Sequence, residues 1–200
     1  CRRTALMLDL ARQVETPATL RKLVRWAAGF GYNEIFLYGE AGFQFPSHPE
    51  ISYPWAMAPD DYRQLEQFAA GHGLRMIPII PLLGHAAYIL NTPALRCLNE
   101  LAETEPAIRC GEHTLCPSHP GTLQLAEDLI RDAARFSTGP YLHVGGDEAG
   151  DTQLFEPITR ALGHAFAGGG GHTHRFTPHG FGFARYGRVA VDHHFGDVVQ

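Results

Sequence analysis

The sequence has very little lysine, few cysteines and no long apolar run. Lys22 is its only lysine, the formal net charge is -5, and the arginines form no cluster. This balance argues against a nucleic acid or an acidic membrane surface as a partner. No apolar stretch approaches the roughly 18 residues that a membrane span needs. The four cysteines show no CxxC spacing, so a disulfide scaffold or a cysteine metal centre is not expected. The cellular compartment is left open.

Short apolar segments alternate with helical patterns along the first 162 residues. The segments predict strands that are covered on both faces, at 5–10, 34–39, 75–80 and 141–146. Between them, Thr16 is a predicted N-cap followed by Pro17 at the first helical position, and further helices are predicted over 58–73 and 120–136. The last of these has one predicted apolar face, formed by Leu123, Ala126, Leu129, Ile130 and Ala133. Residues 81–119 predict irregular structure with one short helix. The alternation predicts an α/β fold around a parallel sheet.

Polar side chains follow the end of every predicted strand. They are Asp9 and Arg12, then Glu40, then His85, and finally Asp147 with Glu148. Because the carboxyl ends of parallel strands share one edge of a sheet, we expect these side chains to converge on a single site there.

The stretch "PYLHVGGDEAGD", residues 140–151, places Asp147 and Glu148 directly after two glycines. The glycines leave space for a ligand to approach the backbone, and His143 shares its strand face with Asp147. Two adjacent carboxylates cannot both ionise without cost, so one is expected to keep its proton and act as an acid. Glycoside cleavage needs such a pair. Adjacent acids after a strand can also simply cap a helix, and a lone histidine can be a satisfied core residue.

Four segments together resemble one known family. "LHVGGDE" resembles the His-x-Gly-Gly-Asp-Glu signature of the family 20 glycoside hydrolases, the β-N-acetylhexosaminidases. "LMLDLAR" (6–12), "LYGEAGFQF" (37–45) and "IPIIPLLGH" (77–85) are similar to that family's first three strand ends. The resemblance covers residues 4 to about 162. It implies a (β/α)8 TIM barrel, of which this chain carries about the first four β/α units.

The resemblance also implies a reaction and the residues that perform it. The reaction is removal of terminal non-reducing β-linked N-acetylhexosamine from an oligosaccharide or glycoconjugate, by a retaining, substrate-assisted mechanism without metal or cofactor. Glu148 matches the general acid, and Asp147 matches the residue that holds the acetamido N–H of the sugar. His85, His143 and Glu40 match substrate-binding positions. Arg3 stands one position away from the family's usual sugar-binding arginine.

The composition changes abruptly after residue 162. Residues 1–162 are expected to form the N-terminal half of the barrel domain. Residues 163–200 contain no Leu, Ile, Lys or Glu, so this Gly- and His-rich tail is expected to be irregular or non-native. Because a closed barrel takes about 250 residues, we expect the chain alone to be inactive.

Other functions are compatible with parts of the sequence. A non-catalytic or inactive carbohydrate-binding homologue would keep the same fold. "GGDE" also occurs in diguanylate cyclases, but there a Phe follows where this chain has Ala149, and short motifs match by chance. The "HTH" at 172–174 and the "HH" at 193–194 suggest metal binding, but they stand in a glycine-rich tail without placed carboxylate or thiolate partners.

Overall fold

The computed structural model describes residues 3–99, 114–145, 182–185 and 188–191. The chain divides into two compact units. Unit 1 contains residues 1–80 and 129–142, and unit 2 contains residues 81–128 and 143–200.

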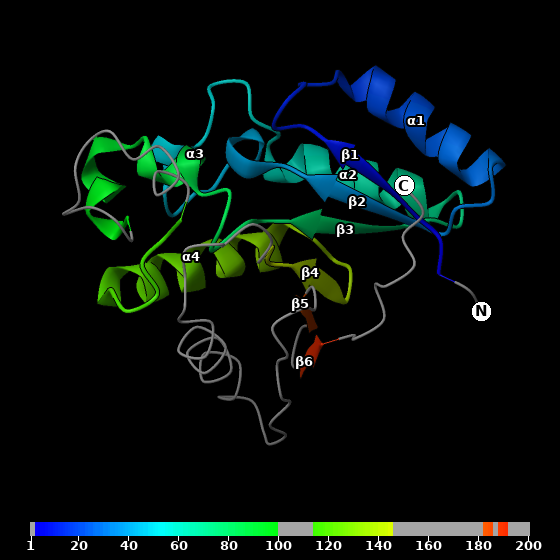
Figure 1. Ribbon diagram of the computed structural model, residues 1–200. Coiled ribbons are helices and arrows are strands. Elements are labelled where there is room, and N and C mark those ends of the chain that lie inside the picture. Colours follow the sequence, from blue (N-terminus) through cyan, green and yellow to red (C-terminus); the bar gives the residue numbers. More distant parts are fainter. Residues whose placement is uncertain (1–2, 100–113, 146–181, 186–187, 192–200) are drawn as a thin grey trace. The chain divides into compact units, whose positions relative to one another are not determined.

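The sheet of unit 1 is built from parallel strands in sequence order. Strands β1 (Ala5–Asp9), β2 (Glu34–Tyr38) and β3 (Arg75–Ile79) run parallel, and β4 (Tyr141–His143) follows β3 in the sheet (Figure 1). The register places Asp9 opposite Tyr38, and Tyr38 opposite Ile79. The carboxyl ends of the first three strands therefore lie level at one edge of the sheet, as the sequence predicted.

Helices α1 (Pro17–Gly29) and α2 (Pro59–Ala70) connect these strands and pack side by side (Figure 1). The hydroxyl of Thr16 accepts the backbone N–H of Thr19 at 3.1 Å, which confirms the predicted N-cap. Helix α2 carries Asp60 and Asp61 in its first turn, where negative charge is favourable at a helix N-terminus. Both helices begin with a proline, whose missing N–H costs nothing at that position.

The loop between β2 and α2 covers a cluster of buried aromatic rings. It contains two short 3₁₀ helices, η1 (Glu40–Gly42) and η2 (Pro49–Ile51). The ring of Phe43 lies 5.9 Å from Tyr62 and 5.4 Å from Phe136, measured between ring centroids. Buried rings at these separations add about 0.5–1.5 kcal/mol per pair beyond area burial. The cluster therefore holds the loop firmly against the helices.

Helix α4 (Pro120–Phe136) contributes residues to both units. Most residues predicted on its apolar face are buried: Ala126, Leu129, Ile130 and Ala133. Leu123 was predicted on the same face but is exposed. None of the described helices is long and apolar enough to cross a membrane.

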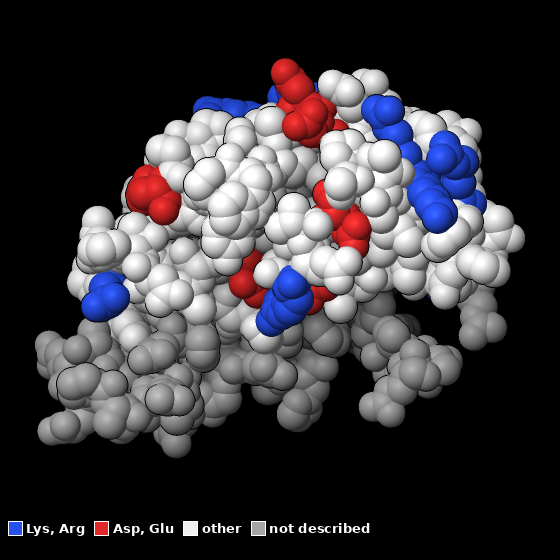
Figure 2. Space-filling view, turned by 90° about the horizontal axis from the view of Figure 1, so that it is seen from above, with Lys and Arg blue, Asp and Glu red and all other residues white. Residues whose placement is uncertain are grey.

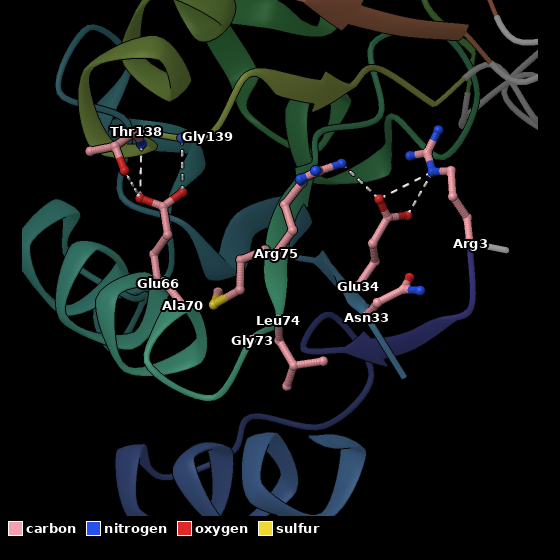
Figure 3. Close-up of a pocket in the computed structure, with 11 residues that line it drawn as sticks. Arg3, Asn33, Glu34, Glu66, Ala70, Gly73, Leu74, Arg75, Thr138 and Gly139 are labelled. Carbon is pink, nitrogen blue, oxygen red and sulfur yellow. Dashed lines mark hydrogen bonds and ion pairs between the residues drawn. The ribbon is translucent and has the colours of Figure 1, made fainter. Parts of the chain in front are cut away.

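The amino ends of the strands carry an ion-pair cluster around the buried carboxylate of Glu34 (Figure 3). The side chain of Glu34 is 4% exposed and both of its oxygens accept from Arg3 Nε at 3.1 Å. Arg75 Nη1 donates to the same carboxylate at 3.0 Å. Both guanidinium groups lie over the ring of Tyr141, at 5.5 and 5.2 Å. Arg3, Glu34 and Arg75 line a hollow of about 520 Å³ at this end of the strands.

Glu66 of α2 fixes the segment between α4 and β4. Its buried carboxylate accepts from Ser137 Oγ at 2.8 Å, from the N–H and the hydroxyl of Thr138 at 2.8 and 2.7 Å, and from the N–H of Gly139 at 3.1 Å. Every donor faces an acceptor oxygen. Figure 3 shows the carboxylate between Thr138 and Gly139.

We expect Glu66→Gln to lower the free energy of unfolding by roughly 2–3 kcal/mol, because an amide turns one acceptor into a donor and leaves a buried donor unpaired. Urea denaturation measures the change. The matched control is Gln67→Ala on the exposed face of the same turn, which we expect to stay within about 0.5 kcal/mol of the wild type. Equal stability of the two variants would contradict this role of Glu66.

Unit 2 contains helix α3 (Ala87–Leu90) and the 3₁₀ helix η3 (Pro93–Leu98), where the sequence predicted one short helix. A backbone hydrogen bond joins two of its segments: the N–H of Leu82 donates to the carbonyl of Val144 at 3.1 Å. Strands β5 (Gly182–Arg185) and β6 (Arg188–Val191) pair antiparallel within the Gly- and His-rich tail. The other tail residues lie outside the described part, so the domain boundary at residue 162 stays a prediction.

Candidate active site

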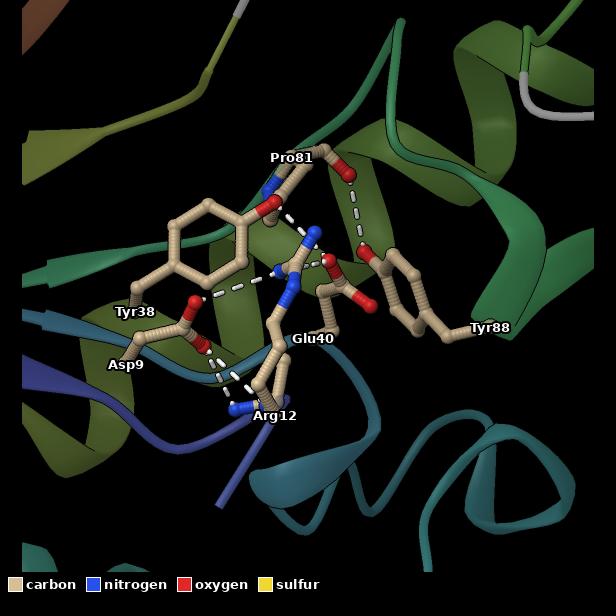
Figure 4. Close-up of polar contacts among 7 residues, drawn as sticks. Asp9, Arg12, Tyr38, Glu40, Pro81 and Tyr88 are labelled. Atoms are coloured by element: carbon tan, nitrogen blue, oxygen red, sulfur yellow. Dashed lines mark hydrogen bonds and ion pairs between the residues drawn. The ribbon is translucent and has the colours of Figure 1, made fainter.

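Asp9 closes a tight turn directly after β1. Its Oδ1 accepts the backbone N–H of Ala11 at 2.9 Å and that of Arg12 at 3.2 Å. An aspartate side chain that accepts the backbone N–H two residues later forms an Asx-turn, which ends the strand and reverses the chain. The turn brings the guanidinium of Arg12 back to the carboxyl ends of β1 and β2 (Figure 4).

Glu40 receives two donors on one oxygen. Arg12 Nη1 lies 2.9 Å from Glu40 Oε1, and the hydroxyl of Tyr38 donates to the same oxygen at 2.9 Å. The guanidinium of Arg12 also lies over the Tyr38 ring, 5.3 Å from its centroid. In the described part of the chain, Glu40 Oε2 accepts no hydrogen bond. The carboxylate is thus held through Oε1 by two donors.

Burial and charge keep the donors of this cluster protonated. Burial raises the pKa of Tyr38, and the negative charge of Glu40 raises it further. Burial by itself lowers the pKa of Arg12, but the hydrogen bond with Tyr38 and the charges of Glu40 and Asp9 outweigh it, so the net direction is upward. A neutral phenol and a full positive charge therefore face Glu40 throughout the neutral range. The face drawn in Figure 2 is mostly uncharged; its charged side chains form small groups, and near the middle a basic group lies beside acidic ones.

The backbone of Glu40 is left-handed. In the described part of the chain the non-glycine residues with positive φ are Glu40, at 44°, and His85, at 54°. Such conformations cost of order 1–3 kcal/mol and persist where the surrounding structure enforces them, often at functional sites. Both residues were singled out from the sequence as substrate-binding candidates, each directly after a strand.

Gly39 allows the turn that presents Glu40. A Cβ at this position would collide with the ring of Phe43, so the residue before Glu40 must lack a side chain. The backbone N–H of Gly42 then donates to the carbonyl of Gly39 at 2.6 Å. The "LYGEAGF" segment is therefore a compact unit that fixes the Glu40 backbone.

His85 and His143 belong to unit 2. His143 is buried, and its Nδ1 accepts the N–H of Gly145 at 3.0 Å, so a neutral ring carries its proton on Nε2. Gly145 makes this contact with φ of 72°, a conformation that favours glycine. His143 is thus oriented by the backbone of Gly145, which follows two residues after it.

Arg3, another predicted site residue, is not brought to this cluster. Arg3 precedes β1 and binds Glu34 at the opposite end of the strand, roughly 20 Å from Asp9 at about 3.3 Å per residue. The structure gives it a place in the ion-pair cluster at the amino ends instead. Asp147 and Glu148 lie outside the described residues, so their convergence with Glu40 stays a prediction.

Tyr38 was missed by sequence reasoning. It stood inside an apolar strand pattern, where an aromatic residue is expected for packing alone. The available signal was its position near the end of the predicted strand, only two residues before Glu40. Among the described residues, no group of three or more His, Cys, Asp or Glu is arranged to hold a metal ion.

Comparison with known proteins gives a consistent result. Residues 4–160 match the family model described as glycosyl hydrolase family 20, catalytic domain. A β-N-acetylhexosaminidase of Cellulomonas fimi is 27% identical over 180 residues, which cover 80% of this chain and 35% of that protein. A β-hexosaminidase of Porphyromonas gingivalis is 30% identical over 92 residues, covering 44% of this chain and 12% of that protein. The chain therefore spans about a third of the first of these relatives.

Solved structures show the same fold. The family 20 β-N-acetylhexosaminidase of Streptomyces coelicolor A3(2) has a TM-score of 0.69 at 23% identity, covering 82% of this chain and 37% of its own. A mutant Streptomyces plicatus β-hexosaminidase in complex with its product GlcNAc has a TM-score of 0.66 at 22% identity, covering 79% and 35%. These likenesses confirm the predicted fold, the N-terminal part of a TIM barrel. With the family match over residues 4–160, they place this chain in glycosyl hydrolase family 20.

Proposed function

We propose that the protein carrying this chain is a β-N-acetylhexosaminidase that removes terminal, non-reducing β-linked N-acetylhexosamine with retention of configuration. The observation that carries the proposal is the "LHVGGDE" signature at the end of β4, inside the stretch that matches the family. The relatives are named for this activity, and one was solved with GlcNAc as its product.

The sugar's own acetamido group supplies the nucleophile in the proposed reaction. Its carbonyl oxygen attacks the anomeric carbon, the glycosidic bond breaks, and an oxazolinium-like intermediate forms. Glu148 gives its proton to the leaving oxygen, and its carboxylate then takes a proton from the water that opens the intermediate. Asp147 accepts the acetamido N–H and offsets the positive charge that develops on the ring.

The Asp9, Arg12, Tyr38 and Glu40 cluster supports this proposal as a preformed substrate contact. Glu40 Oε1 is occupied by Arg12 and Tyr38, at 2.9 Å each, so Oε2 is the oxygen that would accept a substrate hydroxyl or an orienting histidine. His85 and His143 are the histidines proposed to line the same pocket. A carboxylate fixed in advance loses little freedom when substrate binds.

The proposal is tested by the configuration of the first product. The full-length protein is given 4-nitrophenyl N-acetyl-β-glucosaminide, and ¹H NMR follows the anomeric proton of the released sugar. We expect the β-anomer first, with the α-anomer appearing only by mutarotation. Release of the α-anomer first, or equal cleavage of the plain β-glucoside, would contradict it. Sugar binding without any cleavage would favour the inactive homologue.

We expect Tyr38→Phe to lower kcat/KM on this substrate roughly tenfold and the free energy of unfolding by about 1 kcal/mol, because one hydrogen bond to Glu40 is lost while the ring stays. Steady-state kinetics and urea denaturation of the full-length protein measure the two effects. Tyr32→Phe is the control, since its partly exposed ring lies in the turn after α1. Equal kinetics for both variants would show that Tyr38 does not position Glu40.

A further inference from the structure

Two aromatic side chains stand exposed on the loop between β2 and α2. Trp55 is 62% exposed and Tyr53 is 41% exposed. Their rings stack with centroids 5.4 Å apart and planes 16° apart. Exposed apolar patches often mark ligand or partner sites. Flat aromatic rings in particular offer a surface on which the C–H face of a ligand can stack.

The backbone beneath this pair is fixed. The N–H of Tyr53 donates to the carbonyl of Ala41 at 2.9 Å, and the N–H of Met57 donates to the carbonyl of Gly42 at 2.7 Å. A turn bond from the N–H of Ala56 to the carbonyl of Tyr53, at 3.0 Å, places Trp55 at its tip. Met57, two residues after Trp55, forms a parallel β-bridge with the buried Phe43. The aromatic pair is therefore preorganised, which lowers the entropic cost of binding a ligand.

Trp55 forms one wall of a recess of about 130 Å³ between the amino-terminal halves of α1 and α2. Polar side chains from both helices and from the turn after β1 line its rim: Glu15, Arg21, Asp61 and Gln64. In the described part of the chain, the side chains of Asp61 and Gln64 have no hydrogen-bond partner. An aromatic wall with carboxylate, guanidinium and amide groups around it matches a sugar ring, whose C–H face is apolar and whose edge carries hydroxyls.

The recess adjoins the candidate site without being part of it. Leu10 and Gly42 line it; Leu10 follows Asp9, and Gly42 ends the 3₁₀ turn that Glu40 begins. The charged cluster faces the strand ends, and the recess lies on the helix side of the same loops.

We infer that the Trp55 recess is a secondary saccharide site, which takes a β-linked hexopyranose unit beyond the one that is cleaved. The C–H face of this unit stacks on Trp55, and its hydroxyls bond Asp61 and Gln64. The inference rests on the proposed function for its ligand class. Trp26 is also exposed, at 52%, but it differs from Trp55 in two ways. Lys22 lies over its ring at 4.6 Å, and it lines neither of the two described hollows.

Oxidative footprinting with mass spectrometry tests the site in the full-length protein. The Glu148→Gln variant is used so that the probe, N-acetylchitotetraose, is not consumed. We expect the tetrasaccharide to reduce oxidation of Trp55 at least threefold and to leave Trp26 unchanged, whereas the monosaccharide GlcNAc protects neither. Unchanged oxidation of Trp55, or a Trp55 already unreactive because other parts of the protein cover it, would overturn the inference.

Kinetics give the second readout. We expect Trp55→Ala to lower the ratio of kcat/KM for the tetrasaccharide to kcat/KM for the aryl glycoside about tenfold, since an aromatic anchor is lost. Trp26→Ala is the matched control and leaves this ratio unchanged. Cleavage of the aryl glycoside without protection of Trp55 would contradict the secondary site and leave the proposed function standing. Protection of Trp55 without cleavage of either substrate would contradict the proposed function and leave the secondary site standing.

Discussion

Replacing Glu148 by Gln in the full-length protein is expected to lower kcat by about 10²–10⁴ fold on substrates with poor leaving groups, because the proton that assists bond cleavage is no longer available. The effect shrinks as the leaving group becomes more acidic, since an acidic phenol departs without help. A series of aryl N-acetyl-β-glucosaminides of graded phenol pKa measures this dependence. The amide is nearly isosteric with the acid, so binding is expected to persist.

The control for this series is Glu50→Gln. Glu50 lies on η2, where its carboxylate contacts His48, away from the strand ends. We expect wild-type kcat values with every leaving group. A Glu148→Gln variant that loses the same factor with all leaving groups would contradict the general-acid role and would indicate a binding or structural defect instead.

Replacing Arg12 by Met is expected to lower kcat/KM about 10²-fold, because Glu40 loses the cation that aims it and a shift of about 1 Å in a binding group can cost that much. The accompanying loss in the free energy of unfolding is expected to be about 1 kcal/mol. It is this small because the Arg12 side chain is 54% exposed and water screens the pair. Steady-state kinetics and urea denaturation measure the two quantities.

Arg12→Lys separates positioning from simple stability. It keeps the charge but loses the planar fork that reaches Glu40 and lies over the Tyr38 ring. We expect it to restore the unfolding free energy nearly fully and kcat/KM only in part. If Arg12→Met and Arg12→Lys lose stability and activity in the same proportion, Arg12 acts on the fold and does not position Glu40.

The strands and helices of unit 1 were predictable because their signals are local. Buried parallel strands are continuous apolar runs, and a Thr-Pro pair starts a helix by satisfying or removing its free N–H groups. The Thr16 cap and the strand β2 follow from these rules alone. The exposure of Leu123 was not predictable in this way. Periodicity identifies the apolar face of a helix, but it does not show whether another segment covers the end of that face.

The positions of Asp9 and Glu40 at the strand ends were predictable, whereas the contacts that hold them were not. Glu40 stands directly after a strand, which is where parallel sheets place their chemistry. Its ion pair with Arg12 depends on the Asp9 turn, a bond that spacing alone does not reveal. The pairing of Arg3 with Glu34 was not predictable either, because the two residues are 31 apart in the chain and meet only through the fold.

Substrate assistance is tested most directly by fluorinating the acetyl methyl of the substrate. Each fluorine withdraws electrons from the acetamido oxygen, so we expect kcat of the full-length protein to fall stepwise from the acetyl to the mono-, di- and trifluoroacetyl glycoside, while a glucoside without the amide hardly reacts. A flat rate profile across the series would contradict the account and would point to an enzymic nucleophile at Asp147 or Glu40.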